Sequence, residues 1–214
     1  MAEIRKADKG NTEREEKMLG ELLDMEWQMF TSVKDVSGRA ACQDDKKTFT
    51  IMRLSQFLVW DAATLESYYE DVKRAAESGH NLMTEKYARM MERTWPEEYE
   101  KLLPYLEPVP AEKLILVREI LTRQMVMLGQ LEGKYPRTVR RGRPLYSSED
   151  TGADTSTETY LYGELQTYSL ETLRRYDQYM DELQKEGRSL NEEILKITAG
   201  FYGFSGLAQA EAVS

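Results

Sequence analysis

The chain has 214 residues, a formal net charge of −9 at pH 7, 41% hydrophobic residues and 31% charged residues. This composition is typical of a globular protein with a sizeable core and excludes the disordered class. The negative charge, without a basic stripe, argues against nucleic acid or an anionic membrane as the main partner. A single cysteine excludes an internal disulfide, no apolar run could span a membrane, and the polar N-terminus is unlike a signal peptide, so a cytoplasmic protein is expected.

Four helices are predicted in the first half of the chain. Thr12 and Glu15 match a capping box, which predicts that the first helix begins there. Apolar residues at helical spacing predict the next two helices: Phe49, Met52, Phe57 and Trp60 in the second, and Leu65, Tyr68, Tyr69, Val72 and Ala76 in the third. Their boundaries are read from the N-cap type Asp61, the stop glycine Gly79 and the N-cap type Asn81 before the fourth helix.

The second half of the chain carries similar punctuation. A short helix is expected to begin at Pro96, and the proline-rich segment 102–110 connects the halves. Beyond it, helix boundaries are indicated by the capping-box pair Thr155 and Glu158, the N-cap types Ser169 and Ser189, and the stop glycine Gly187.

These landmarks recur in the same order in both halves, at an offset that only grows. Glu21 corresponds to Glu119 at an offset of 98, and Tyr68 corresponds to Tyr176 at an offset of 108. Such a drift is what duplication followed by loop insertion leaves behind. We therefore predict one all-α domain over residues 1–214, with about eight main helices in two tandem four-helix units. The units span about 12–94 and 111–203, are joined by a linker at 95–110, and share one core around a pseudo-twofold axis.

Polar residues interrupt the apolar stripes of the predicted helices. Glu26 lies on the buried face of the first helix, and Gln124 occupies the corresponding point in the second half. Arg53 and Gln56 lie among the apolar positions of the second helix, and Glu164 corresponds to Gln56. A buried charge is costly unless it is paired. One interpretation is an internal network that pairs Glu26 with Arg53 and Gln56 with Glu164; the other is a set of groups that line a pocket between the halves.

Two loops supply a second set of candidates. Each contains an arginine, hydrogen-bonding residues and two acids: Arg39, Gln43, Asp44 and Asp45 in the first, and Arg143, Ser148, Glu149 and Asp150 in the second. Acids at a helix start favour its dipole, so capping by Asp45 and Asp154 is one explanation. Alternatively, the four acids hold Mg²⁺ and the arginines bind a carboxylate or phosphate. The basic run 137–143 is expected to be a loop, either merely solvated or anion-binding.

Other chemistries find little support in the sequence. The only histidine, His80, is expected to lie exposed in a turn, and Cys42 has no cysteine partner for a zinc site. No glycine-rich phosphate loop follows a strand, because no strand is indicated.

Three segments resemble a known family: GRAACQDDKKTFTIMRLSQFLVW at 38–60, NLMTEKYARMME at 81–92 and SSEDTGADTSTETYLYGELQTYS at 147–169. They are similar to the bacterial family catalogued as domain of unknown function 4125. The resemblance implies a soluble bacterial protein without an assigned activity, and no catalytic residue is carried over from it.

Three functions are compatible with these residues. The first is binding of a small polar or anionic ligand between the halves, through Arg39, Arg53, Gln56, Trp60 and Arg143. The second is a metal-assisted hydrolase of phosphate esters or nucleotides, with Asp44, Asp45, Glu149 and Asp150 as metal ligands and Glu26 as the base. The third is an interaction module whose acidic surface docks a basic partner. The sequence identifies neither a cofactor nor an oligomeric state.

Overall fold

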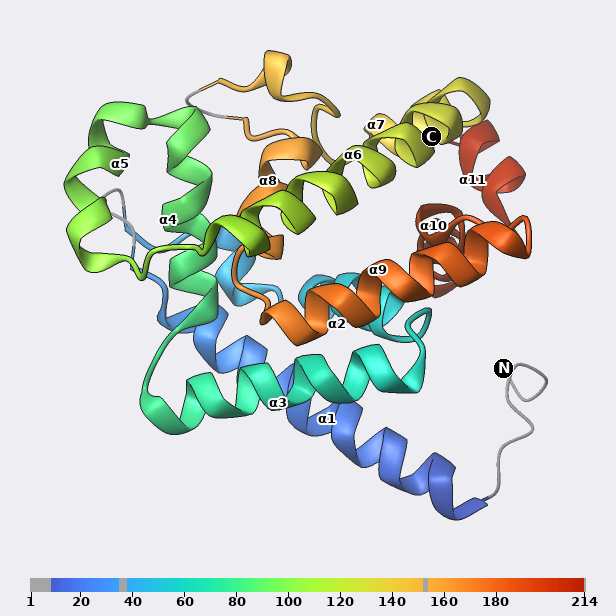
Figure 1. Ribbon diagram of the computed structural model, residues 1–214. Coiled ribbons are helices and arrows are strands. Elements are labelled where there is room, and N and C mark those ends of the chain that lie inside the picture. Colours follow the sequence, from blue (N-terminus) through green and yellow to red (C-terminus); the bar gives the residue numbers. More distant parts are fainter. Residues whose placement is uncertain (1–8, 35–37, 152–153, 214) are drawn as a thin grey trace.

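A computed structural model describes residues 9–34, 38–151 and 154–213, which form a wholly helical protein (Figure 1). Over this part of the chain 78% of the residues are helical, in 11 α-helices and three short 3₁₀ helices, and there is no strand. Three of these helices have seven residues or fewer, which leaves eight longer ones. The all-α prediction is confirmed. Within the same ranges, none of the helices is both long and apolar enough to cross a membrane.

The first four helices begin and end close to where the sequence predicts. They are α1 (Lys9–Ser32), α2 (Lys46–Phe57), α3 (Ala62–Ser78) and α4 (Leu82–Thr94). Asp61 and Asn81 accept hydrogen bonds from the backbone amides of Thr64 and Thr84, and Gly79 takes a left-handed conformation with φ of 74°. The predicted start at Thr12 is wrong, because α1 already includes Lys9.

The remaining helices include two that the sequence did not indicate, α7 and α11. The chain continues through α5 (Pro96–Leu102), α6 (Ala111–Lys134), α7 (Pro136–Arg140), α8 (Thr157–Leu165), α9 (Leu170–Lys185), α10 (Leu190–Phe201) and α11 (Leu207–Val213). Short 3₁₀ turns lie at Ala41–Asp44, Leu103–Tyr105 and Ser147–Glu149.

Two predicted boundaries need correction. The basic run at 137–143 is partly helical, since α7 runs through it to Arg140. The N-cap of α8 is Ser156, whose hydroxyl accepts from the Thr159 amide, rather than Thr155 or Asp154. Adjacent Ser and Thr are equivalent cap types, so the sequence could not choose between them. Ser169 and Ser189 cap α9 and α10 as predicted.

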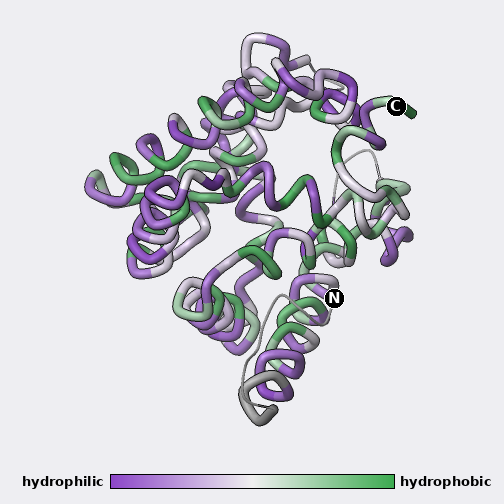
Figure 2. The backbone as a smooth tube through the Cα atoms, turned by 90° about the vertical axis from the view of Figure 1, so that its right-hand side faces the viewer, coloured by the Kyte–Doolittle hydropathy of each residue, from purple (hydrophilic) through white to green (hydrophobic). Residues whose placement is uncertain are grey.

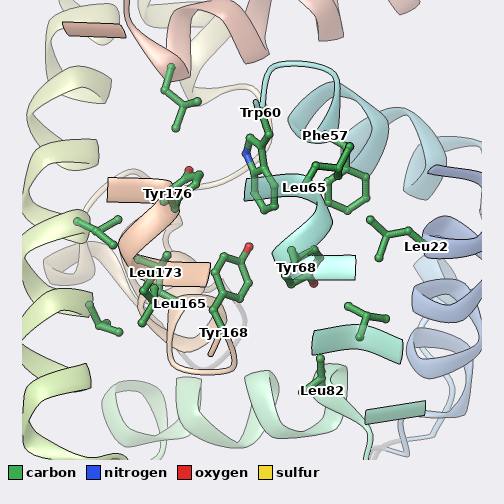
Figure 3. Packing of buried hydrophobic residues seen from close by; sticks show 14 of the residues in the cluster. Leu22, Phe57, Trp60, Leu65, Tyr68, Leu82, Leu165, Tyr168, Leu173 and Tyr176 are labelled. Carbon is green, nitrogen blue, oxygen red and sulfur yellow. The ribbon is translucent and has the colours of Figure 1, made fainter. Parts of the chain in front are cut away.

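The main core cluster contains residues of α1 to α4, α6 and α8 to α10, beside a small second cluster between α10 and α11. At its centre four aromatic rings from both halves of the chain meet: Trp60, Tyr68, Tyr168 and Tyr176 (Figure 3). The ring centroids of Tyr68 and Tyr168 are 4.7 Å apart, and those of Trp60 and Tyr176 are 5.2 Å apart. Each such pair contributes about 0.5–1.5 kcal/mol beyond its burial. Hydrophilic and hydrophobic residues alternate around the helices (Figure 2), as expected for helices that cover a common core.

Two residues of the predicted apolar stripes lie outside the core. Met52 is 48% exposed, and Ala76 is exposed while its neighbour Ala75 is buried. In α2 the buried residues are Ile51, Arg53, Ser55 and Phe57. Because α2 is packed between α1 and α10, it is covered from two directions and does not present a single stripe.

Helix pairs connect the two halves of the chain. The long helix α1 packs against α2, α3 and α4, and the equally long α6 packs against α8, α9 and α10. Three further contacts cross between these groups: α3 with α9, α4 with α8, and α2 with α10. The second helix of each group therefore packs on a helix of the other group.

Gly163 allows α8 to approach α4 closely. A Cβ atom at this position would lie 2.6 Å from Met90 Cγ and 2.8 Å from the Lys86 carbonyl oxygen. Both distances are shorter than van der Waals contact, so only glycine fits without a shift of the backbone. The close approach brings the next residue, Glu164, within reach of the Lys86 ammonium group.

Candidate functional site

A buried ionic network lies where α1, α2, α4 and α8 meet. Arg53 of α2 is at its centre, with 5% of its surface exposed. Its Nε and Nη2 atoms donate to the two carboxylate oxygens of Glu26 on α1, at 2.7 and 2.6 Å. Its Nη1 donates to Gln56 Oε1 and to Glu164 Oε1 of α8, both at 2.7 Å, and Nη2 also donates to the Tyr68 hydroxyl at 3.2 Å. All five guanidinium N–H groups thus have acceptors.

Lys86 and two tyrosines complete the network. Lys86 is only 2% exposed, and its ammonium group donates to Glu164 Oε2 at 3.1 Å. The Tyr68 hydroxyl donates to Glu26 at 2.6 Å, and the Tyr168 hydroxyl donates to Glu164 at 2.9 Å. Two carboxylates therefore face two cations, and the cluster is neutral overall. This balance is what makes four buried charges tolerable.

The neighbouring charges determine the protonation of the network. Burial by itself would raise the pKa of Glu164, but the charges of Arg53 and Lys86 outweigh burial and hold that pKa well below its usual range. Burial raises the pKa of Tyr68 and of Tyr168 well above the ordinary value, with further contributions from Glu26 and Glu164 respectively. Both phenols therefore stay protonated and act as donors to the carboxylates.

The network agrees with one of the two interpretations drawn from the sequence. The contact between Glu26 and Arg53 is confirmed. Gln56 and Glu164 are joined through Arg53, which donates to both. Lys86 was missed, although it too is a polar residue among buried positions of its helix, next to Leu82, Met83 and Met90. The rule that singled out Glu26 would have found it. Trp60 is 2% exposed and packs in the aromatic cluster of the core.

The first candidate loop closes the C-terminal end of α1. Gln43 is buried, and its Nε2 donates to the carbonyl oxygens of Phe30 and Val33 at 2.8 and 3.0 Å. Arg39 donates to the Thr31 carbonyl and to Asp44. Asp45 caps α2 by accepting from the Thr48 amide at 2.9 Å. Donors at the end of a helix satisfy carbonyl groups that have no partner within the helix.

The second candidate loop precedes α8 and forms hydrogen bonds with the first residues of that helix. Asp150 accepts from the Ser156 amide and the Thr159 hydroxyl, both at 2.5 Å. Glu149 accepts from the Leu145 and Tyr146 amides at 3.2 and 3.1 Å. Ser148 is exposed. Both acids therefore accept hydrogen bonds from donors in the loop and in the helices α7 and α8 beside it, which explains why acids stand at these two positions.

Arg143 connects this loop to the buried network. Its guanidinium carbon lies 4.4 Å from the centre of the Tyr160 ring, and Nη1 donates to the Thr155 carbonyl. The Lys86 ammonium lies 3.7 Å from the centre of the same ring. Tyr160 thus carries a cation–π contact with an exposed arginine and another with the buried lysine.

The four loop acids do not gather into a metal site. Among the side chains that the structure describes, no three of the types His, Cys, Asp and Glu are grouped as a metal ion would require. The hydrolase hypothesis therefore has no cluster of ligands within these ranges to support it. His80 is exposed in the turn after α3, as expected, and its Nε2 lies 2.7 Å from Glu85 Oε2.

Two shallow grooves lie outside the network. One, of about 300 Å³, lies between α3 and α9 and includes Ser67, Glu70, Arg74 and Arg175 in its lining. The other, of about 320 Å³, lies between α1 and α3. Neither groove is lined by any of the candidate site residues predicted from the sequence. A groove between helices that face each other could be found only from the tertiary structure.

Comparison with known proteins identifies the family to which the chain belongs. A family model described as protein of unknown function (DUF4125) matches residues 16–212, nearly the whole chain. The chain belongs to this family. The resemblance drawn from the three sequence segments is confirmed, and the family description names no activity. Neither the curated proteins nor the solved structures contain a match to the chain.

Proposed function

We propose that this member of the family is a non-catalytic interaction module that docks a basic partner. The observation that carries this proposal is the segment 95–112, called the acidic end below, which contains five glutamates and one lysine. Its helix α5 buries no residue. Trp95, Leu103 and Tyr105 are 51%, 48% and 86% exposed, beside these carboxylates. Exposed aromatic groups surrounded by charges of one sign are typical of protein interaction surfaces.

The buried network favours this assignment over a ligand site at the same place. Its charges are balanced, all the guanidinium donors of Arg53 are used, and both carboxylates receive several hydrogen bonds. A ligand that entered there would have to break these contacts and expose an unpaired charge, at a cost of about 3–5 kcal/mol. We therefore assign the network to holding α1, α2, α4 and α8 together.

The test is titration with a deca-arginine peptide, followed by fluorescence. Of the three tryptophans, Trp95 alone is more than half exposed, whereas Trp60 is buried and Trp27 is half-buried, so a contact at the acidic end should change the Trp95 signal. We expect a saturable change that is lost in the triple variant Glu97→Lys, Glu98→Lys and Glu100→Lys.

A matched control separates this surface from the net charge. The variant Glu13→Lys, Glu16→Lys and Glu77→Lys makes the same change in net charge at exposed positions of α1 and α3. It should bind deca-arginine as the wild type does. Equal weakening in both triple variants would show that the peptide responds to net charge alone, and the proposal would fail.

A small polar or anionic ligand between the two halves is our second candidate. The groove between α3 and α9 supports it, because Arg74 and Arg175 border that groove from the two halves of the chain. Thermal shift with phosphate, nucleotides and carboxylates should then show stabilisation that is lost in Arg74→Ala with Arg175→Ala. Loss in Arg39→Ala with Arg143→Ala would instead place the ligand at the two loops. No shift with any of these compounds would count against the candidate.

We also propose that the chain is a tandem duplication folded as one domain in the cytoplasm. The contacts of α1 with α2, α3 and α4 support the duplication, since α6 makes the corresponding contacts with α8, α9 and α10. The crossed contacts of α2 with α10 and of α8 with α4 are related in the same way, as a pseudo-twofold axis requires. The main core cluster contains residues of both halves and so supports one domain, and the single cysteine is compatible with a reducing compartment.

A further inference from the structure

The long helix α6 has ends of opposite charge. It contains 24 residues, which corresponds to a length of about 36 Å. The acidic end, residues 95–112, leads into its N-terminus. Residues 134–143, called the basic end below, begin at its last residue and contain five lysines or arginines and no acid. Figure 1 shows α5 and α7 on opposite sides of the molecule, connected by α6. This polarity also suits the dipole of α6, which favours anions near its N-terminus and cations near its C-terminus.

Both ends contain charged side chains that form no ion pair with another described residue, although Glu211 of α11 lies near Arg137 and accepts from its backbone amide. At the acidic end, Glu98 pairs with Lys101 and Glu112 pairs with Arg174. Within the described residues, Glu97, Glu100 and Glu107 form no ion pair, and all three are exposed.

At the basic end, Arg140 pairs with Glu132 and Glu149, and Arg143 stacks on Tyr160. In the part of the chain that the structure covers, Lys134, Arg137 and Arg141 form no ion pair, and they too are exposed. The two ends thus present complementary chemistry: carboxylates with exposed aromatic rings on one side, and cations on the other. Guanidinium groups bind carboxylates and also stack on aromatic faces.

We propose that copies of this chain associate head to tail, with the acidic end of one copy docked on the basic end of the next. The proposal rests on the proposed function and names the basic partner as a second copy. Because the two surfaces differ and lie at opposite ends of α6, each copy can use both at once, which produces rings or linear chains of copies. The net charge of −9 opposes association, but at physiological ionic strength it is screened beyond about 8 Å, whereas contacting charges are screened less.

We expect a weak interface, because each end is small. Small, transient interfaces bury less than about 1,200 Å² in total. The dissociation constant should then lie between about 1 µM and 1 mM. Sedimentation velocity over this concentration range, in about 0.1 M and about 0.5 M salt, should show association that is stronger at the lower of the two salt concentrations.

Charge reversal at each end gives a decisive test. The acidic-end variant is Glu97→Lys, Glu98→Lys and Glu100→Lys, and the basic-end variant is Lys134→Glu and Arg141→Glu. Each variant alone should remain monomeric at every concentration. In the acidic-end variant both ends are positive, and in the basic-end variant residues 134–143 keep three arginines beside two new glutamates, so little net charge remains to attract the acidic end. An equimolar mixture of the two should associate again, since each supplies the surface that the other lacks. The control triple variant at Glu13, Glu16 and Glu77 should associate as the wild type does.

Each remaining outcome overturns the head-to-tail arrangement. A wild type that stays monomeric, a mixture that stays monomeric, or a basic-end variant that associates normally would each exclude it. If the wild type stays monomeric but deca-arginine still binds at the acidic end, this inference fails while the proposed function stands. If the peptide does not bind either, both fail.

Discussion

Two buried polar clusters occupy comparable positions on the two long helices, and one is charged while the other is neutral. On α1, Glu26 accepts from the Tyr68 hydroxyl of α3 at 2.6 Å. On α6, Gln124 donates to the Tyr176 hydroxyl of α9 at 3.3 Å, and Asn191 of α10 donates to Gln124 at 3.5 Å. Both clusters place a polar side chain and a tyrosine between a long helix and its neighbour.

The difference between the clusters lies in their neighbours. Arg53 and Lys86 reach the carboxylates of the first cluster. In the sequence correspondence the matching positions are Leu161 and Ile194, which carry no charge. A carboxylate is therefore tolerated where cations reach it, and an amide stands where they do not. Buried charges have to be introduced or removed as a balanced set.

The largest expected effect on stability comes from expressing the second half of the chain, which contains the neutral cluster, without the first half. Residues 111–214 expressed alone would lack α4, the partner of α8, and α2, the partner of α10. We expect this half to be unfolded or to associate with itself through the exposed faces. Circular dichroism and sedimentation would measure this. A monomeric half that melts like the intact chain would contradict a shared core.

Removing Arg53 should cost far more than the matching change in the neutral cluster. Arg53→Met leaves Glu26 and Glu164 with Lys86 as the remaining cation, so we expect a loss of about 3–5 kcal/mol in the free energy of unfolding. Gln124→Met removes weak neutral hydrogen bonds and should cost about 1 kcal/mol. Urea unfolding measures both.

A double-mutant cycle with Glu26→Gln tests the charged pair directly. Glu26→Gln with Arg53→Met should lose less stability than the two single changes combined. Strict additivity would mean that the contact between these side chains does not contribute to stability.

Acid should weaken the charged cluster specifically. The pKa of Glu164 is lowered in the folded protein, so its contribution to stability is present above its unfolded pKa and is lost as the pH falls through the folded value. A folded pKa that lies one pH unit below the unfolded pKa corresponds to about 1.4 kcal/mol of stability. Between pH 5 and pH 3 the wild type should lose at least about 1 kcal/mol more than Glu164→Gln does. Parallel curves for the two proteins, from urea unfolding at several pH values, would contradict this.

A smaller contrast concerns two threonines that lie three residues after their helix caps. The Thr172 hydroxyl donates to buried Asp71 at 2.6 Å, whereas the Thr64 hydroxyl is buried and has no partner among the described residues. Thr172→Val should therefore destabilise the protein by about 1–2 kcal/mol, and Thr64→Val should be neutral or stabilise it by up to about 1 kcal/mol. Equal losses from the two substitutions, measured by thermal unfolding, would show that Thr64 has a partner after all.

The sequence predicted best those features that depend on neighbouring residues. The caps at Asp61 and Ser169 and the stop at Gly79 follow from local backbone chemistry, and all three are confirmed. The contact of Glu26 with Arg53 was predictable because each interrupts an apolar stripe and their charges need compensation.

Features that depend on tertiary packing could not be predicted in this way. Met52 was misplaced because α2 is covered from two directions, and the loop acids were ambiguous because a cap and a metal ligand require the same residue types. The crossing of α8 over α4 depends on Gly163, which looks like an ordinary helix glycine in the sequence.

That close crossing has a consequence for the motions of the molecule. With no side chain between them at Gly163, α4 and α8 cannot separate without exposing the ionic network, so their amides should exchange with deuterium only when the whole domain opens. By contrast, α5 buries no residue, and its amides should exchange through local opening, orders of magnitude faster. The α4–α8 contact should then be the most slowly exchanging part of the chain, and the proposed docking surface should lie on one of the fastest.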